Sequence, residues 1–272
     1  MTMEELQAIR TESEQVNRLY DLFDEEARLT DTPAARVEFL TTMRVLQRYL
    51  QPGARVLDLG AGTGRYSLAL ARLGCTVDAL ELADRNVAVF RQKLAAEPQL
   101  SVALRQGNAL DLAAYPTASY DAVLLFGPLY HLHAAADRRR CLAEAKRVCK
   151  PGGIVCCAFI NNDMVLFTEL GYDPDYLKGQ SYDHETFKVE DFPFVFFNLT
   201  QCRQMLQEAG LQTEAEVAAD GLSELMAERI NALDEESYRQ YLRCHWAMCQ
   251  KPEMLGHSNH LLFVTRPLPA QG

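Results

Sequence analysis

The segment VLDLGAGTGRYS, Val56 to Ser67, decides the fold of this chain. It starts as a short apolar run and then places Gly60, Gly62 and Gly64 ahead of a helix-like segment. Glycine lets a backbone turn sharply and approach a ligand, because no Cβ stands in the way. The free N–H groups at the start of the next helix point to the same place. We therefore predict a strand, a ligand-binding loop and a helix, in that order.

The same alternation of strands and helices continues along the chain. Apolar, β-rich runs occupy 54–60, 76–80, 101–105, 122–125, 154–160, 211–217 and 261–266. Segments with helical spacing of apolar residues occupy 65–73, 85–96, 137–149 and 201–209. Strands that alternate with helices favour an α/β fold with a doubly wound, mostly parallel sheet.

Two further parts surround this core. Residues 1–50 have helical apolar stripes broken at Pro33, and we predict that they form an N-terminal helical cap. Residues 51–272 then form the main domain, with insertions at about 161–200 and 220–258. The first insertion is rich in aromatic and acidic residues and follows the end of a predicted strand, which is where open α/β sheets bind ligands. A lid is one interpretation of it, and an extra packing layer is the other.

Composition excludes several classes of protein. A net charge of −10 in 272 residues gives no general attraction to nucleic acid or to anionic membranes. The basic cluster at 137–147 has the spacing of a solvated helix face. The apolar runs are shorter than the roughly 20 residues of a membrane span, and the first residues lack an apolar signal region, so we expect a cytoplasmic protein. Eight scattered cysteines without a CxxC pair indicate reduced, buried thiols.

Three polar residues narrow the kind of ligand. Asp58 precedes the first glycine, where a carboxylate can hold an ammonium group or order the loop. Glu81 closes the next strand, where it can accept hydrogen bonds from two ribose hydroxyls. Asn108 follows the third strand and can meet an adenine edge. A dinucleotide site needs GxGxxG, but Gly64 comes two residues after the second glycine and no second nucleotide half follows.

Together these features resemble the class I S-adenosylmethionine-dependent methyltransferases. The resemblance covers about 55–160 and includes RVCKPGGIVCCAF at 147–159. It implies a seven-stranded sheet whose last, inserted strand is antiparallel, with S-adenosylmethionine as cofactor and S-adenosylhomocysteine as product. It also implies that the glycine loop holds the methionine portion, Glu81 the ribose and Asn108 the adenine, although many relatives have Asp in place of Asn108. The predicted cofactor residues are Tyr20, Asp58, Gly60, Ala61, Gly62, Thr63, Gly64, Tyr66, Glu81, Leu82, Asn108, Ala109, Phe126 and Gly127.

The segment FGPLYHLH, Phe126 to His133, bears on the acceptor. Amino-group methylases carry (Asn/Asp)-Pro-Pro-(Tyr/Phe) at this position, and the leading polar residue is missing here. The segment instead resembles the GPLYHL variety of bacterial small-molecule methyltransferases, a group similar to the ubiquinone and menaquinone methylases. This resemblance implies a small-molecule acceptor.

The same segment contains the predicted catalytic residues. Histidine suits proton transfer near neutral pH, so His131 is a candidate base with Tyr130 as an orienting hydroxyl. The alternative is that His131 only caps or packs near the cofactor. His131 and His133 offer two ligands at most, and we predict no metal site.

Two other functions stay open at this point. One is an RNA- or protein-modifying methyltransferase, which needs an accessible recognition groove. The other is a non-catalytic protein that binds S-adenosylmethionine, because cofactor residues alone do not establish turnover.

Overall fold

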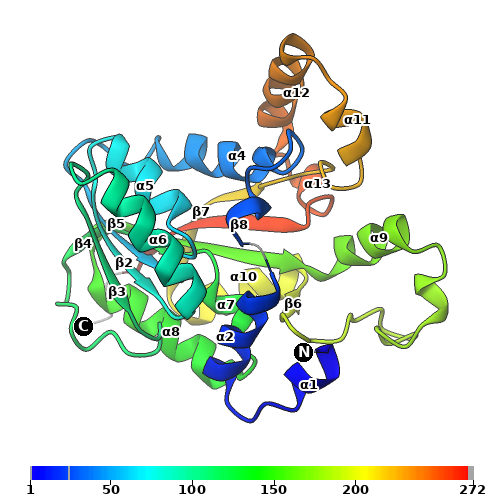
Figure 1. Cartoon of the computed structure of the whole chain (residues 1–272), viewed down its shortest axis with the longest axis horizontal. Helices are drawn as coiled ribbons and strands as arrows, with labels where there is room; N and C mark the ends of the chain where they lie inside the picture. Colours follow the sequence, from blue (N-terminus) through cyan, green and yellow to red (C-terminus); the bar gives the residue numbers. More distant parts are fainter. Residues whose placement is uncertain (1, 24, 269–272) are drawn as a thin grey trace.

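The computed structural model describes residues 2–23 and 25–268. A single sheet runs through the molecule in the order β3-β2-β1-β4-β5-β8-β7 (Figure 1). Its strands are β1 Arg55–Leu59, β2 Thr76–Glu81, β3 Val102–Gln106, β4 Tyr120–Leu125, β5 Cys149–Asn161, β6 Phe196–Phe197, β7 Leu211–Ala218 and β8 His260–Pro267. The seven predicted strands are present, and the two-residue β6, which pairs with β5, adds an eighth.

The direction of β8 decides which of its ends lies at the carboxyl edge of the sheet, where the parallel strands end. β1 pairs in parallel with β2 and β4, and β4 with β5. β8 lies between β5 and β7 and runs antiparallel to both, which confirms the predicted topology. The start of β8 therefore lies at the same edge as the carboxyl ends of the other strands. Open α/β sheets bind their ligands at this edge.

Helices cover both faces of the sheet. They are α1 Met3–Gln7, α2 Glu12–Leu22, α3 Glu25–Arg28, α4 Arg36–Leu46, α5 Arg65–Arg72, α6 Asp84–Ala96, α7 Pro128–His131, α8 Ala135–Val148, α9 Asn162–Tyr172, α10 Leu199–Glu208, α11 Ala227–Asn231, α12 Glu235–Met248 and α13 Pro252–Leu255, with a 3₁₀ turn at Tyr176–Lys178. Figure 1 shows α9 and the loop that follows it extending away from the end of the sheet.

Two apolar layers form the core, one on each face of the sheet. Side chains alternate between faces along a strand, and in β5 this alternation sends Cys157 into one layer and Cys156 into the other. The first layer contains Leu142 of α8 and Leu206 of α10. The eight cysteines all lie in the described part of the chain and are free thiols, seven of them buried and Cys244 exposed.

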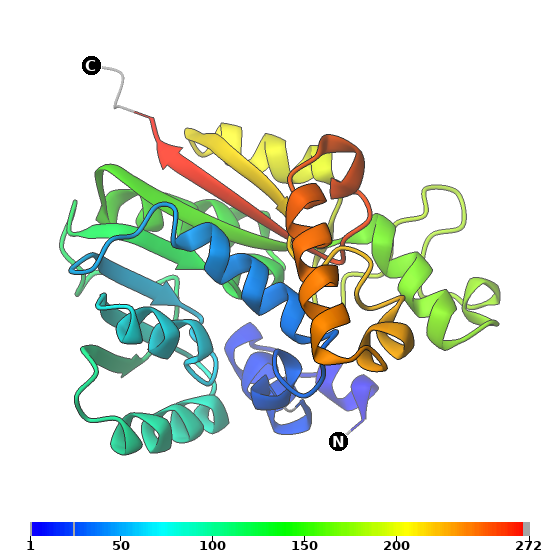
Figure 2. The ribbon, with the colours of Figure 1, turned by 90° about the horizontal axis from the view of Figure 1, so that it is seen from above.

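Residues 1–50 serve two different purposes. α4 belongs to the second apolar layer, through Leu46 among others. It also lies beside α12 (Figure 2), where Trp246 Nε1 donates a hydrogen bond to Thr41 Oγ1 at 3.2 Å. Arg44 lies over the Trp246 ring, 4.7 Å from its centre. The earlier helix α2 instead covers the carboxyl edge of the sheet, as described below.

Over residues 2–23 and 25–268, the structure contains no helix with both the length and the apolar character needed to cross a bilayer.

Candidate active site

The glycine loop turns back on the end of β1 as its sequence requires. Gly60, Gly62 and Gly64 have φ values of +70°, +56° and +83°, in the left-handed region that favours glycine. The Gly60 N–H donates to Leu80 O at 2.8 Å, and the Gly64 N–H donates to Ala61 O at 2.9 Å. Gly64 is the N-cap residue of α5. The loop therefore presents its backbone at the carboxyl edge of the sheet.

Asp58 is buried beneath this loop. Its Oδ2 accepts a hydrogen bond from Ser67 Oγ of α5 at 2.6 Å. Burial, assisted by the nearby Glu81 carboxylate and opposed by the Ser67 bond, raises the pKa of Asp58 to about 6. Near pH 7 this buried carboxylate is ionised, and a cationic group bound beside it would stabilise its charge.

This burial predicts that Asp58 reduces the stability of the fold. The pKa of Asp58 is about 6 in the fold and about 3.9 in an unfolded chain. The fold tolerates the neutral carboxyl group, so below pH 4 Asp58 costs no stability. As the pH rises from 4 through 6 the group must ionise in its buried place, and the free energy of unfolding falls. We expect Asp58→Asn to raise the free energy of unfolding at pH 7 by about 1 to 3 kcal/mol. Urea denaturation at pH 7 and pH 4.5 checks this, and an equal change at both pH values would contradict the explanation.

Glu81 joins the loop to the end of β2. One carboxylate oxygen accepts from the Gly62 N–H at 2.8 Å, and the other accepts from the Ala83 N–H at 2.9 Å. Asn86 Nδ2 donates to the second oxygen at 3.3 Å. The oxygen that accepts only from Gly62 retains a lone pair for a further donor, whereas the other already accepts two bonds. Glu81 thus orders the loop and can also accept a hydroxyl hydrogen of a ligand.

Two cavities meet at the glycine loop. Cavity 1 has a volume of about 570 Å³ and cavity 2 about 460 Å³, and Tyr20, Gly60 and Gly127 line both. The predicted cofactor residues that line cavity 1 only are Glu81, Leu82, Asn108 and Ala109, and the predicted base His131 lines it too. The predicted cofactor residues that line cavity 2 only are Asp58, Ala61, Gly62, Thr63, Tyr66 and Phe126, together with Tyr130. Of the predicted cofactor residues, Gly64 lines neither cavity, because it packs against α6 instead.

Cavity 1 is lined in part by α2, which contacts the predicted adenine residue. Asn108 Nδ2 donates to Ser13 Oγ at 3.1 Å, and Asn108 Oδ1 accepts from the Leu110 N–H at 2.9 Å. α2 thus covers the cavity at the residue predicted to meet adenine.

A second contact from α2 lies at the junction of the two cavities. The Tyr20 hydroxyl and His131 Nε2 form a hydrogen bond of 2.9 Å. Phe194, from the first insertion, packs against His131 with ring centres 5.2 Å apart. The N-terminal helix and the insertion therefore both contact His131 at this junction, and the lid stays a prediction.

The predicted catalytic residues are both buried. Burial lowers the pKa of His131 to about 4, so its ring is neutral near pH 7. His131 Nδ1 is buried without a hydrogen-bond partner among the described residues. The Tyr130 hydroxyl lines cavity 2 and donates to Phe126 O. The roles of His131 as a base and of Tyr130 as its orienting group stay predictions.

Several lining residues were not predicted. Ser13 and Val16 line cavity 1. Ser13 precedes Val16 by three residues and Val16 precedes Tyr20 by four, which places all three on one helix face. That spacing is a signal that could have found them. Glu25 and Arg28 line cavity 2 and form an ion pair of 3.2 Å. A charged pair three residues apart is common on exposed helices and gives no such signal.

The two cavities fit an S-adenosyl group. Cavity 1 offers a carboxylate for a ribose and an amide end for a base, and cavity 2 offers buried Asp58 and the bare loop backbone for an amino acid portion. Gly62 has a left-handed φ and faces Glu25, whose Cγ would lie 3.4 Å from an added Cβ. A side chain at Gly62 would therefore fill part of cavity 2.

Comparison with known proteins gives the family. Residues 57–157 match the family described as "Methyltransferase domain". The chain is 33% identical over 150 residues to the Ubiquinone biosynthesis O-methyltransferase of Xanthomonas campestris pv. campestris strain B100, covering 54% of this chain and 61% of that protein. It is 30% identical over 199 residues to the protein of the same name from Xanthomonas axonopodis pv. citri strain 306, covering 73% of this chain and 77% of that protein.

A solved structure shares the fold. Phosphoethanolamine N-methyltransferase 2 of Haemonchus contortus, in complex with S-adenosyl-L-methionine, superposes with a TM-score of 0.60. It is 17% identical and covers 96% of this chain and 61% of its own. The glycine loop, the sheet order and the sequence relatives agree. This chain belongs to the class I S-adenosylmethionine-dependent methyltransferases.

Proposed function

We propose that this protein transfers a methyl group from S-adenosylmethionine to a small-molecule acceptor. The observation that carries the proposal is the junction of cavities 1 and 2 at Gly60, with Glu81 on one side and Asp58 on the other. This arrangement suits a ligand with a sugar at one end and an ammonium group at the other. S-adenosylhomocysteine is the product that this proposal implies, and a cytoplasmic location stays a prediction from the sequence.

The chain's own residues have a limited chemical task in such a reaction. When bound, S-adenosylmethionine supplies an electrophilic methyl group and a good leaving group. The protein has to align the acceptor with that group and exclude water. Tyr20 from α2 and Phe194 from the insertion both contact His131 over the cavity junction, and they supply that cover.

A small acceptor is supported by the relatives. Both proteins named above carry the name of an O-methyltransferase of ubiquinone biosynthesis. The first match spans 61% of that relative's length, so the acceptor of this chain is part of the proposal. The GPLYHL segment, which forms α7 and its flanks, supports the same class.

Calorimetry and an acceptor screen test the proposal in two steps. Calorimetric titration with S-adenosylmethionine and S-adenosylhomocysteine should show binding of both at one site. Release of S-adenosylhomocysteine from a panel of phenols, thiols, amines and quinols should then identify the acceptor. Failure to bind either nucleoside would refute the proposal at its first step.

The base role of His131 has its own test. His131→Ala should lower the methylation rate and leave cofactor affinity largely intact if His131 accepts a proton. If His131 only holds α2 through Tyr20, His131→Ala and Tyr20→Phe should both weaken cofactor binding instead. Rate and affinity measured on both variants separate the two roles, and an undiminished rate would end the base hypothesis.

A further inference from the structure

A third cavity lies at the same edge of the sheet. Cavity 3 has a volume of about 810 Å³, and Arg28 lines both it and cavity 2. Glu38, Asp220 and His260 also line it. Cavity 3 therefore shares the Arg28 side chain with the cavity predicted to hold the methionine end of the cofactor.

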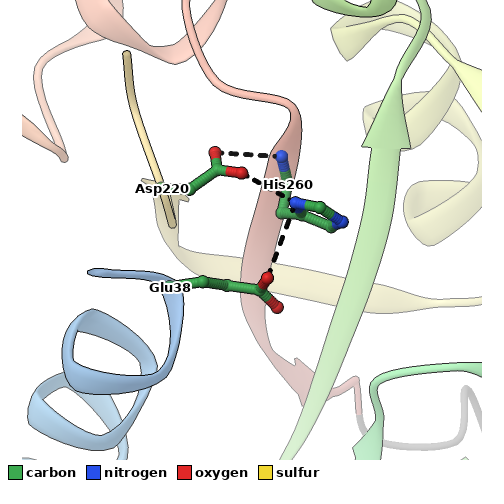
Figure 3. Close-up of side chains that lie close together, drawn as sticks. All are labelled: Glu38, Asp220 and His260. Atoms are coloured by element: carbon green, nitrogen blue, oxygen red, sulfur yellow. Dashed lines mark hydrogen bonds and ion pairs between the residues drawn. The ribbon is translucent and has the colours of Figure 1, made fainter. Parts of the chain in front are cut away.

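The topology explains why three distant residues meet there. Asp220 lies two residues beyond the carboxyl end of β7, and His260 is the first residue of β8. Because β8 is antiparallel, its first residue lies at the carboxyl edge, where it pairs with Ile160 of β5. Glu38 comes from α4. Figure 3 shows the two carboxylates approaching the same side of the His260 ring.

Contacts fix one nitrogen of His260 and leave the other open. His260 Nδ1 lies 2.7 Å from Asp220 Oδ2 and 3.5 Å from Glu38 Oε2. Arg28 Nη1 donates to the same Glu38 oxygen at 2.8 Å. His260 Nε2 points away from both carboxylates (Figure 3) and has no hydrogen-bond partner in the described part of the chain. The His260 side chain is 23% exposed and lines cavity 3.

We propose, on the basis of the proposed function, that cavity 3 binds the methyl acceptor and that the neutral form of His260 takes the proton from a phenolic hydroxyl at its Nε2. As the O–H bond breaks, its proton bonds to Nε2 and its electron pair stays on oxygen. That oxygen forms the new bond to the methyl carbon, and the electron pair of the broken C–S bond stays on sulfur. Asp220 and Glu38 stabilise the imidazolium that results. In this proposal His260 and not His131 is the base, and His131 keeps its alternative role of packing beside the cofactor site against Tyr20 and Phe194.

A phenol fits this environment better than other acceptors do. Burial lowers the pKa of His260, but Glu38 and Asp220 outweigh this and Arg28 opposes them, which gives a pKa of about 9. A phenol has a pKa of about 10, so the two groups can share a proton with little cost. The carboxylates of Glu38, Asp220 and Glu224 disfavour an acceptor that carries its own negative charge. The remaining wall includes Ala34, Ala35, Tyr172 and Ala227, which can contact an aromatic ring.

A bound cation is the other occupant to consider for this group. Glu38, Asp220 and His260 each offer one ligand atom within 4.8 Å of the others. However, His260 Nδ1, the ring nitrogen that faces the carboxylates, is hydrogen bonded to Asp220. At neutral pH the arrangement is therefore that of a charged histidine beside two carboxylates, and the neutral form that can accept a proton grows as the pH rises toward 9. Added Mg²⁺ is one arm of the test.

The test uses the full chain, 4-nitrocatechol as a coloured phenol, and catechol as a methylation substrate. With S-adenosylhomocysteine present, bound 4-nitrocatechol should ionise about one pH unit lower than the free compound, because the charged His260 ring lies beside it and favours the phenolate. His260→Gln should abolish this shift and reduce catechol methylation about 100-fold. It should also remove the rise of the wild-type rate with pH toward 9. Asp220→Asn should weaken both effects without removing His260.

The control is His257→Gln, which changes an exposed histidine three residues before His260 and should leave both readouts unchanged. Affinity for S-adenosylhomocysteine within twofold of wild type shows that the variants fold. The dye titration is repeated without nucleoside, so that phenol binding is judged even if the proposed function fails. An unshifted dye, a pH profile unchanged in His260→Gln, or activity that requires Mg²⁺ and is lost with EDTA would each overturn the proposal.

Discussion

Replacing Gly64 with alanine is expected to lower the free energy of unfolding by about 3 to 4 kcal/mol. A Cβ at Gly64 would lie 2.2 Å from Cε2 of Phe90, which is buried on α6, and the backbone there has a φ of +83°. The substitution therefore adds steric overlap to left-handed strain. Urea denaturation monitored by circular dichroism measures the loss.

Gly53 is the matched control for this change. It has a φ of +88°, and a Cβ there would meet no heavy atom of the described residues within 4 Å. Gly53→Ala should therefore show the backbone strain alone, about 1 to 2 kcal/mol. If Gly64→Ala and Gly53→Ala lowered the free energy of unfolding equally, steric overlap with Phe90 would not be the cause of the loss at Gly64.

Replacing Glu81 with alanine is expected to weaken binding of S-adenosylmethionine about 10- to 100-fold, which corresponds to about 1 to 3 kcal/mol. Two effects combine: the ribose hydroxyls lose a charged acceptor, and the Gly62 N–H loses its 2.8 Å bond. Calorimetric titration of wild type and variant gives the ratio directly.

Two further variants separate these effects. Glu81→Gln keeps an oxygen for the Gly62 N–H but removes the charge, so its affinity should lie between those of wild type and Glu81→Ala. Glu208→Gln, an exposed change at the end of α10, should leave affinity unchanged. Unaltered affinity in Glu81→Ala would refute the assignment of the ribose to this carboxylate.

The sequence predicts the parts of the fold that depend on neighbouring residues. The strand, loop and helix around Gly60 follow from local rules of glycine and apolar spacing, and the structure has them where they were predicted. Asp58 and Glu81 were found because each stands at the end of a strand. The opposite orientations of Cys156 and Cys157 follow from the same local geometry.

Contacts between distant segments could not be predicted in this way. Tyr20 and His131 were each predicted from their own surroundings, but nothing local indicates that they bond to each other. Glu38, Asp220 and His260 come from three separate elements, and only the antiparallel placement of β8 brings them together. The eighth strand, β6, is two residues long and exists only because β5 extends past Ile160 to meet it.

The position of β8 also bears on how the protein is made. A ribosome delivers β5 and β7 before β8, yet β8 is the strand that lies between them. Until β8 emerges, both neighbours have an open edge, and unpaired edges attract other chains. We therefore expect nascent chains that end before residue 260 to depend on chaperones and to aggregate when released, whereas chains extended through Pro267 fold.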